Sequence, residues 1–449
     1  MAETTPRGFE ATSSRPPSRR LRVLILAYAC DPERGSEVAA GWGITRTVGE
    51  FADFVALVGP EHEPAIRCWR ERTGDEGGHY VVVPEPWWGP MANRTRIGRF
   101  LTYLAWLRQA YRVGLELHAR EPFDVALHAT YSVYWLPSPV GRFGIPAVWG
   151  PVGGAVTTPR PLLRVLGWKG LLGEAFDWAA VRLAALWPGT RRTWREAAVI
   201  IVQNEETLRR LPTDLRQSAM VLNHVLFLEP PQPPGAAAPP DPDRLVYVSP
   251  LEARKGPALV LRALARTPAH VRLDVLGDGP ERPALERLAH RLGLAGRIQF
   301  LGRIPRPEVM RHLRSASAAI CTGLREEGGC SLAEAMHLGT PVIVLAHGGA
   351  PTIAGAGTDR ARISLVEPAD VATTADRLAA AILRHVSAVD RVPRTPLLDK
   401  QMAQQLLRAA LTRAGSADRS IRTRRLTTRH DTTRPAPGAP HAHAGPVGR

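Results

Sequence analysis

The chain reads Glu326-Glu327-Gly328-Gly329-Cys330-Ser331-Leu332-Ala333-Glu334-Ala335-Met336, and Gly339-Thr340-Pro341 and an apolar strand follow. This pattern is typical of a glycine turn that leads into a helix. A helix start presents free backbone N–H groups and the positive end of the helix dipole, which together favour a phosphate. Two acids, Glu326 and Glu334, flank the turn and are suited to hold sugar hydroxyls. The stretch indicates a nucleotide-sugar site, provided that the rest of the chain supplies a further cation and a fold to hold it.

The same residues have a purely structural alternative. Ser331, followed three residues later by Glu334, has the spacing of a capping box, in which the two side chains satisfy free N–H groups at a helix start. In that case Glu334 only caps its own helix. The pattern alone leaves both interpretations open.

Length and composition predict a soluble or peripheral protein of two domains. The chain has 449 residues, of which 44% are hydrophobic and 22% charged, and this length exceeds one ordinary domain. No apolar run approaches the roughly 20 residues that cross a bilayer. Residues 1–20 lack the apolar core of a signal peptide, so we expect no secretion. The four cysteines are widely spaced without a Cys-x-x-Cys pair, which supports neither zinc nor a disulfide framework and favours reduced thiols.

The net charge of +16 raises the question of an anionic partner. Arginines are spread along the whole chain without a DNA- or RNA-binding motif, so we expect no nucleic acid partner. Part of the excess lies in the two ends of the chain. An anionic membrane surface or an anionic acceptor fits this charge at least as well.

Short apolar runs alternate with longer amphipathic segments, which predicts repeated βαβ units on parallel sheets. The first half contains seven strand candidates, at residues 21–28, 54–58, 80–83, 124–128, 146–149, 198–202 and 220–222. The second half contains six, at residues 245–248, 271–277, 297–301, 318–321, 341–345 and 363–366. We therefore expect an α/β protein with two Rossmann-like domains.

A proline-rich segment separates the two series of strands and can form neither a helix nor a strand ladder. The two ends of the chain lack hydrophobic periodicity. The predicted organisation is a disordered tail over residues 1–20, a first domain over 21–228, a linker over 229–244, a second domain over 245–413 and a disordered basic tail over 414–449.

Several further segments, taken in chain order, resemble one known family. A glycine-serine-glutamate loop, Gly35-Ser36-Glu37, follows the first strand, and Val148-Trp149-Gly150-Pro151-Val152-Gly153-Gly154 comes later in the first half. The second half contains a turn ending in Arg254-Lys255-Gly256, then Gly277-Asp278-Gly279-Pro280, Phe300-Leu301-Gly302-Arg303-Ile304-Pro305 and, after the acidic stretch, His347-Gly348-Gly349-Ala350-Pro351. Over roughly residues 21–413 the chain resembles the GT-B fold glycosyltransferases of family 4, also described as glycosyl transferases group 1.

The resemblance implies a role for each matching residue. It assigns Glu334 to the ribose hydroxyls of the nucleotide, Glu326 to the donor sugar and Lys255 to the diphosphate, and it places His128 in the cleft near the transferred sugar. The first domain then faces the acceptor and the second holds the donor, with the last helix able to pack back on the first domain. Further donor-binding candidates are Gly35, Ser36, Arg254, Glu327, Gly328, Gly329 and Cys330.

Some of these positions have alternatives. Glu327 is one step from Glu326 and competes with it for the donor sugar. The family has an arginine five residues before the lysine, where this chain has Pro250, so Arg254 is the candidate to compensate. From the residues alone, Lys255 is equally a solvated surface lysine and His128 a partly buried histidine at a strand end.

Two segments, residues 94–108 and 168–194, mix aromatic residues, leucines and arginines. One interpretation is a pair of amphipathic helices that pack on the core and have cationic outer faces. The other is a surface for anionic lipid or for a lipid-linked acceptor.

The resemblance implies a retaining glycosyltransferase, most simply a hexosyltransferase of polysaccharide biosynthesis. Such an enzyme moves a sugar from a nucleoside diphosphate to a glycan, lipid-linked or small-molecule acceptor, without a metal or other cofactor. The expected location is the cytoplasm, with the inner face of the membrane as a further option. The alternatives are a catalytically impaired GT-B homologue that serves as a binding or scaffold subunit, and a GT-B epimerase or phosphorylase. Neither the donor base and sugar nor the acceptor and the oligomeric state follow from the sequence.

Overall fold

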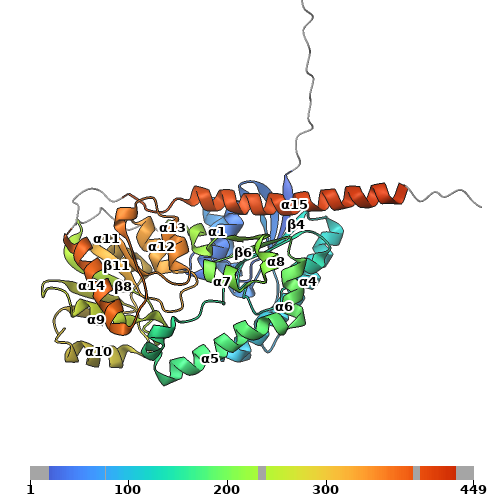
Figure 1. The fold of residues 1–449 in the computed structure, drawn as a ribbon. Helices are drawn as coiled ribbons and strands as arrows, with labels where there is room; N and C mark the ends of the chain where they lie inside the picture. Colours follow the sequence, from blue (N-terminus) through green and yellow to red (C-terminus); the bar gives the residue numbers. More distant parts are fainter. Residues whose placement is uncertain (1–19, 76, 231–238, 388–394, 431–449) are drawn as a thin grey trace, which may run out of the picture.

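The first half of the chain forms a parallel seven-stranded sheet in the order β3-β2-β1-β4-β5-β6-β7 (Figure 1). A computed structural model describes residues 20–75, 77–230, 239–387 and 395–430. The strands are β1 (Leu21–Leu26), β2 (Ala52–Val58), β3 (His79–Val82), β4 (Val125–His128), β5 (Ala147–Val152), β6 (Val199–Val202) and β7 (Ala219–Val221). Each overlaps a strand predicted from the sequence.

The second half forms a parallel six-stranded sheet in the order β10-β9-β8-β11-β12-β13. Its strands are β8 (Asp241–Val248), β9 (Arg272–Leu276), β10 (Ile298–Gly302), β11 (Ala316–Cys321), β12 (Val342–Leu345) and β13 (Ile363–Val366). Two doubly wound α/β domains therefore face each other, which confirms the predicted fold class.

Helices connect these strands and cover both faces of each sheet. In the first domain they are α1 (Glu37–Gly49), α2 (Glu63–Thr73), α3 (Gly89–Ala92), α4 (Arg96–Arg120), α5 (Gly167–Leu183), α6 (Pro188–Glu196), α7 (Glu205–Arg210) and α8 (Thr213–Arg216), with short 3₁₀ turns η1 (Pro60–His62), η2 (Val140–Phe143), η3 (Arg160–Leu166), η4 (Ala184–Leu186) and η5 (His224–Phe227). In the second they are η6 (Ala253–Lys255), α9 (Pro257–Leu264), α10 (Arg282–Arg291), α11 (Arg306–Ser315), α12 (Cys330–His337), α13 (Ala350–Gly355), η7 (Arg360–Arg362) and α14 (Val371–Ser387); α15 (Lys400–His430) follows.

Strand β1 shows how the sequence pattern builds the layers. Because successive side chains of a strand point to opposite faces, Val23 and Ile25 pack on the α1 side, whereas Leu24 and Leu26 pack on the α4 side with Trp106. Both faces are buried, so the strand is apolar throughout, as expected for a parallel sheet between two helical layers.

Both sheets reverse their strand order beside their first strand, at β1/β4 and at β8/β11. Ligands of open α/β sheets bind at such switch points, beyond the carboxyl ends of the strands. The loops after β1 and β8 are therefore the expected walls of a site. They carry Ser36 and Lys255, respectively.

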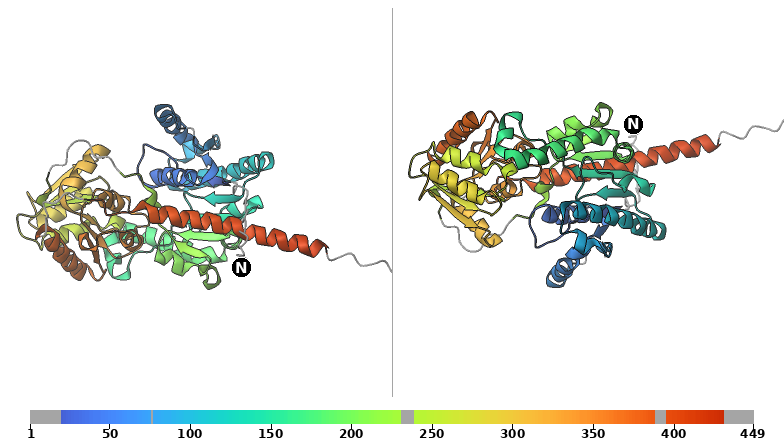
Figure 2. Two further views of the ribbon diagram at one scale, coloured as in Figure 1. Left: turned by 90° about the horizontal axis from the view of Figure 1, so that it is seen from above. Right: turned by 90° about the horizontal axis from the view of Figure 1, so that it is seen from below.

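The long helix α15 joins the two domains. It follows the second domain in the chain but lies along the first (Figure 2), where Leu407 and Leu411 are buried in the core that also contains β1 and α1. Gly415 lies close to Leu21 and Val125. The helix continues to His430, so residues 414–430 are helical where a disordered tail was predicted. The rest of that tail and residues 1–19 lie outside the described residues.

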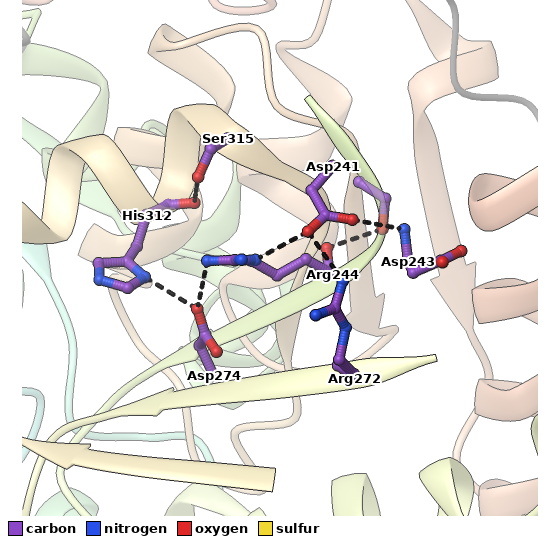
Figure 3. Close-up of polar contacts among 8 residues, drawn as sticks. Asp241, Asp243, Arg244, Arg272, Asp274, His312 and Ser315 are labelled. Atoms are coloured by element: carbon purple, nitrogen blue, oxygen red, sulfur yellow. Dashed lines mark hydrogen bonds and ion pairs between the residues drawn. The ribbon is translucent and has the colours of Figure 1, made fainter. Parts of the chain in front are cut away.

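Strand β8 begins at Asp241, four residues inside the segment 229–244 that the sequence predicts as a linker. Figure 3 shows the reason. The carboxylate of Asp241 pairs with Arg244 at 3.2 Å and with Arg272 of β9 at 3.1 Å, and Asp274 pairs with His312 of α11 at 2.9 Å. Ionic contacts between neighbouring strands thus hold an Asp-Pro-Asp sequence that by itself reads as a turn.

Removal of the buried contact made by α15 should destabilise the first domain. We expect Leu411→Ala to lower the free energy of unfolding by about 2–5 kcal/mol, because it leaves a cavity between α15 and the core of the first domain. Met402→Ala changes an exposed side chain on the same helix and should cost less than about 0.5 kcal/mol. Chemical denaturation monitored by tryptophan fluorescence measures both, and equal losses would contradict the assigned packing.

Candidate functional site

A cavity of about 560 Å³ lies where the two domains meet. Its walls are the loops after β8, β9 and β10 and the start of α12, together with Ser36 from the first domain. Five of the residues that the sequence singles out line it, namely Ser36, Arg254, Lys255, Glu326 and Cys330. The carboxyl ends of the second sheet and the loop after β1 thus share one cleft.

Glu326 and Lys255 form an ion pair on the wall of this cleft. The Lys255 Nζ lies 2.6 Å from Glu326 Oε2, and the other carboxylate oxygen accepts a hydrogen bond of 3.0 Å from the Gly329 amide at the start of α12. Burial alone would raise the pKa of Glu326, but Lys255 and the amide more than offset this and lower the pKa below its usual range. Glu326 is therefore ionised at neutral pH, and a cation and a helix start stand beside it.

Glu327 points to the other domain. Its carboxylate accepts hydrogen bonds from the Val156 amide at 3.0 Å and from Asn204 Nδ2 at 2.8 Å, both in the first domain. Burial raises the pKa of Glu327. The side chains of the two adjacent acids thus point to different places, since Glu326 lines the cleft and Glu327 binds the opposite domain.

Glu334 lies one turn inside α12 and does not form the capping box. The helix begins after Gly329, which adopts a left-handed conformation with φ 53°. The carboxylate of Glu334 pairs instead with Arg306 of α11 at 2.9 Å, and burial raises its pKa. Glu334 is not among the described residues that line the cavity, although it lies close to Cys330, which does.

Arg254 and Lys255, the two cations of the turn after β8, are each paired with a carboxylate. Lys255 lies on η6 and pairs with Glu326, and the Arg254 Nε lies 2.6 Å from Glu252. Pro250 also lines the cavity, at the place where the family has an arginine. A bound anion would therefore have to compete with a carboxylate for either cation.

Ser36 brings the first domain into the cleft. Its hydroxyl lies 3.9 Å from the Cys330 sulfur across the two domains, next to Gly35 in the loop that enters α1. Its backbone has φ 67° and ψ −149°, a conformation that residues other than glycine rarely adopt. Strain of this kind concentrates at functional sites, where the surrounding structure holds it.

His128 lies at the end of β4 but is only 2% exposed. Its Nδ1 pairs with the Ser138 hydroxyl at 2.7 Å and its Nε2 with the Tyr103 hydroxyl at 2.9 Å. Burial lowers its pKa to about 4, so the ring is neutral at neutral pH. This placement fits the alternative of a buried histidine at a strand end, and the role near a transferred sugar stays a prediction.

Cys330 and Gly328 have structural reasons for their positions. Burial raises the pKa of the Cys330 thiol to about 12, so it is not a nucleophile at neutral pH. A Cβ at Gly328 would lie 2.5 Å from the ring of His224. Residue 328 therefore has room for backbone only, and the positive φ of Gly329 favours glycine at the next position.

Two further ion pairs join the domains beside the cleft. His347, after β12, pairs with Glu206 of α7 at 2.8 Å, and Arg325 pairs with Asp177 of α5. Burial alone would lower the pKa of His347, but Glu206 more than offsets this and raises it. The same contact keeps the pKa of Glu206 below its usual range, against the opposing effect of burial. Both groups are therefore charged around pH 5–6.

The cavity includes residues to which the sequence assigned no chemistry, such as Asp278 after β9 and Arg303 after β10. Both belong to segments that supported the resemblance, and the rule that ligands bind beyond strand ends could have singled them out. Glu37, at the start of α1, is a further residue without an assigned role, although it is not among the described residues that line the cavity. Its carboxylate accepts a 2.7 Å hydrogen bond from the Tyr131 amide, and burial raises its pKa to about 7. The described residues contain no cluster of three or more His, Cys, Asp or Glu suited to a metal ion.

The fold and this interdomain site define a GT-B architecture, and comparisons with known proteins agree. Among solved structures, an Anabaena protein, Alr3699/HepE in complex with UDP-glucose, is similar with a TM-score of 0.52 and 15% identity over 87% of this chain and 99% of its own. Residues 231–388 match the family model described as "Glycosyl transferases group 1". The second domain of this chain is thus a group 1, family 4, glycosyltransferase domain, as the motifs predicted.

Curated relatives match this chain over part of its length. A D-inositol 3-phosphate glycosyltransferase from Mycolicibacterium smegmatis is 31% identical over 158 residues, which are 34% of this chain and 36% of the relative. A GDP-mannose-dependent alpha-(1-6)-phosphatidylinositol monomannoside mannosyltransferase from the same organism is 28% identical over 277 residues, covering 53% of this chain and 69% of the relative. The chain spans about a third of the length of the first curated relatives that it matches.

Relief of the strained backbone at Ser36 should stabilise the protein. Glycine adopts this conformation without steric cost, so Ser36→Gly should raise the free energy of unfolding by about 1 kcal/mol relative to Ser36→Ala, which keeps the strain and also lacks the hydroxyl. Thermal unfolding of the two variants measures this difference. A glycine variant less stable than the alanine variant would show that the surroundings do not hold Ser36 in strain.

The His347–Glu206 pair should make the closed arrangement depend on pH. Because folding raises the pKa of His347 above 6.5, its contribution is complete below that pH and is lost as the pH rises through the folded value; because folding lowers the pKa of Glu206, the contribution is also lost on acidification below 4.5. The difference in melting temperature between the wild type and His347→Gln should be largest at about pH 5–6 and shrink toward alkaline pH. His290→Gln, at an exposed position on α10, is the matched control. A difference independent of pH would contradict the pairing.

Proposed function

We propose that this protein is a retaining glycosyltransferase that moves a sugar, most simply a hexose, from a nucleoside diphosphate to an acceptor. The observation that carries the proposal is the Lys255–Glu326 pair at the start of α12, inside a cleft between two Rossmann-like domains. A cation and a helix start serve a diphosphate, while a carboxylate that remains ionised serves sugar hydroxyls. The group 1 domain at residues 231–388 supports this assignment.

The proposed reaction requires few groups beyond these. As the bond from the anomeric carbon to the diphosphate breaks, negative charge builds on the leaving group and positive charge on the sugar ring. We assign Lys255 and the amides at residues 328–330 to the former and Glu326 to the sugar. The Gly329 amide then exchanges its hydrogen bond with Glu326 for one with the diphosphate. In the ligand-free state Lys255 and Glu326 satisfy each other, so donor binding exchanges one charge-assisted contact for others.

The remaining donor contacts follow from the same cleft. We assign Ser36, with Gly35 beside it, to the diphosphate from the first domain and Glu334, one turn inside α12, to the nucleotide ribose. Arg254 has a supporting cationic role once it leaves Glu252. Glu327 serves the reaction by joining the domains around the donor. Because closed domains exclude water, they protect the activated sugar from hydrolysis.

The names of similar proteins suggest donor candidates without separating them. One relative is named for GDP-mannose and one structural neighbour binds UDP-glucose. The acceptor is a glycan, a lipid-linked saccharide or a small molecule. We place the reaction in the cytoplasm, a reducing compartment that suits the four free cysteines.

A second candidate, a catalytically impaired homologue that serves as a binding or scaffold subunit, is favoured by one observation. Pro250 replaces an arginine in the cleft wall, and Arg254, the candidate to compensate, is paired with Glu252. The two candidates differ in what donors do to the purified protein. A catalyst is stabilised by at least one nucleotide sugar and turns it over, whereas the impaired homologue shows no turnover.

A thermal-shift screen against UDP, GDP and their sugars tests the site, because a ligand stabilises the folded state by mass action. We expect one of them to raise the melting temperature of the wild type. Lys255→Ala should abolish that shift and reduce transfer roughly a hundredfold or more, since it removes the cation that faces the diphosphate.

Lys169→Ala, at an exposed lysine outside the cleft, is the matched control and should retain the shift. A full shift and full transfer in Lys255→Ala would sink the site assignment. No shift of the wild type with any member of the panel would favour the impaired homologue.

A further inference from the structure

Helix α5 has its polarity reversed relative to an ordinary surface helix. Trp168, Leu172 and Phe176 recur every four residues and are 69%, 65% and 62% exposed. The opposite side carries Glu174 and Asp177, which are both buried. A helix on the surface of a soluble protein normally buries its apolar stripe and exposes its charges. Nothing in the described part of the chain covers the apolar stripe of α5, so the stripe needs a further partner.

The buried acids explain how the helix is held in this orientation. Glu174 accepts hydrogen bonds from the amide and the hydroxyl of Thr158, at 2.7 and 2.8 Å, and Arg325 of the second domain pairs with Asp177. Polar contacts thus fix the inner side of α5, and the apolar side is held outward by them. The exposure is a consequence of built contacts on the other side of the helix.

The apolar stripe continues beyond the end of α5. Leu183, Leu186 and Trp187 are exposed at 57%, 71% and 61%, which extends the surface through η4 to the start of α6. We call residues 168–187 and the adjoining arginines of α6 the α5 surface. Scattered exposed apolar residues are ordinary, but exposed apolar residues that gather on one side of a helix and its extension mark an interaction site.

Positive charges border this surface. Lys169 lies over the Trp168 ring at 5.4 Å and Arg182 over the Trp178 ring at 5.2 Å. Arg191 and Arg195 of α6 line a cavity of about 420 Å³ next to Leu186. Tryptophans, leucines and basic residues on one outward side are the combination that binds at the interface of an anionic bilayer.

We propose that the α5 surface docks on an anionic lipid bilayer. Charge favours this occupant over a second copy of the chain, because the arginines and lysine of two such surfaces would meet and repel. The proposed contact is interfacial, through the outward side of α5. Within the described part of the chain, none of the helices has the length and apolarity of a membrane span. Figure 1 shows α5 at the edge of the molecule opposite α15, which leaves it free to meet a planar surface.

Docking on this side has a consequence for the proposed transfer reaction, on which this part of the inference rests. The inner side of α5 forms one wall of a second cavity, of about 550 Å³, together with Arg99 and Arg254. Arg254 also lines the donor cleft, so the two cavities adjoin. An acceptor anchored in the bilayer by a lipid would reach this second cavity from the docked side. The inference selects the lipid-linked class from the three acceptor classes.

Co-sedimentation with lipid vesicles tests the docking. The full chain should bind vesicles of phosphatidylcholine mixed with phosphatidylglycerol, and bind vesicles of phosphatidylcholine alone more weakly. The triple variant Leu172→Ser, Phe176→Ser, Leu183→Ser should lower the partition coefficient roughly tenfold or more, because it removes apolar contact area. Arg191→Glu with Arg195→Glu should weaken binding to the anionic vesicles by a similar factor and reduce its salt dependence.

Matched controls lie on the opposite side of the molecule. Met402→Ser and Arg413→Glu change exposed residues of α15 and should leave binding unchanged. Melting temperatures and the donor-induced thermal shift of every variant show whether the fold and the donor site are intact. If no donor shifts the melting temperature of the wild type, the proposed function is contradicted but the docking is not. If the wild type shows the donor shift but does not bind vesicles, only the docking is contradicted.

Three outcomes would overturn the inference. The wild type does not bind either kind of vesicle, or the triple variant binds as well as the wild type, which would assign binding to another part of the chain. In the third, light scattering shows a dimer that the triple variant converts to a monomer while vesicle binding stays unchanged, so the α5 surface contacts a second copy instead.

Discussion

Two adjacent carboxylates, those of Glu326 and Glu327, set the relation between the donor cleft and the closed arrangement of the domains. Although adjacent in the chain, the two side chains point in opposite directions. Here one direction leads to Lys255 in the same domain and the other to Val156 and Asn204 in the first domain. The turn that presents the helix start of α12 to the cleft is therefore also a contact between the domains. Any movement of one domain displaces the other's contribution to the site.

The backbone around this turn is as constrained as its side chains. The Glu326 carbonyl accepts a hydrogen bond of 2.7 Å from the Gly349 amide, and a Cβ at Gly349 would lie 2.0 Å from the Glu327 carbonyl oxygen. Glycine at this position lets the loop after β12 approach the turn that carries both acids. That loop also holds His347, whose pair with Glu206 reaches the first domain. Site geometry and domain contact thus depend on the same few residues, which suits a reaction that must exclude water.

Much of this architecture could be predicted from the sequence, because its signals are local. Apolar runs separated by amphipathic segments identified the strands of both sheets, and the glycine turn before Cys330 identified the helix start that faces the cleft. The predictions differ from the structure where contacts with residues far away in the chain determine the local conformation. Asp241 reads as part of a linker until Arg272 of the neighbouring strand is placed beside it. Residues 414–430 read as part of a tail, although α15, which packs on the first domain up to Ala414, continues through them.

The sequence by itself determined the fold class, the group 1 glycosyltransferase domain and the residue types that meet at its site, since these depend on periodicity and on motifs of fixed spacing. Only the tertiary structure decided which acid faces the cleft. Glu326 and Glu327 are equivalent in composition and differ only in what lies opposite each. The same holds for His128, which hydrogen bonds to Ser138 and Tyr103 keep buried, and for α5, whose buried acids hold its apolar side outward. Direction is a property of contacts between segments far apart in the chain, and no local pattern encodes it.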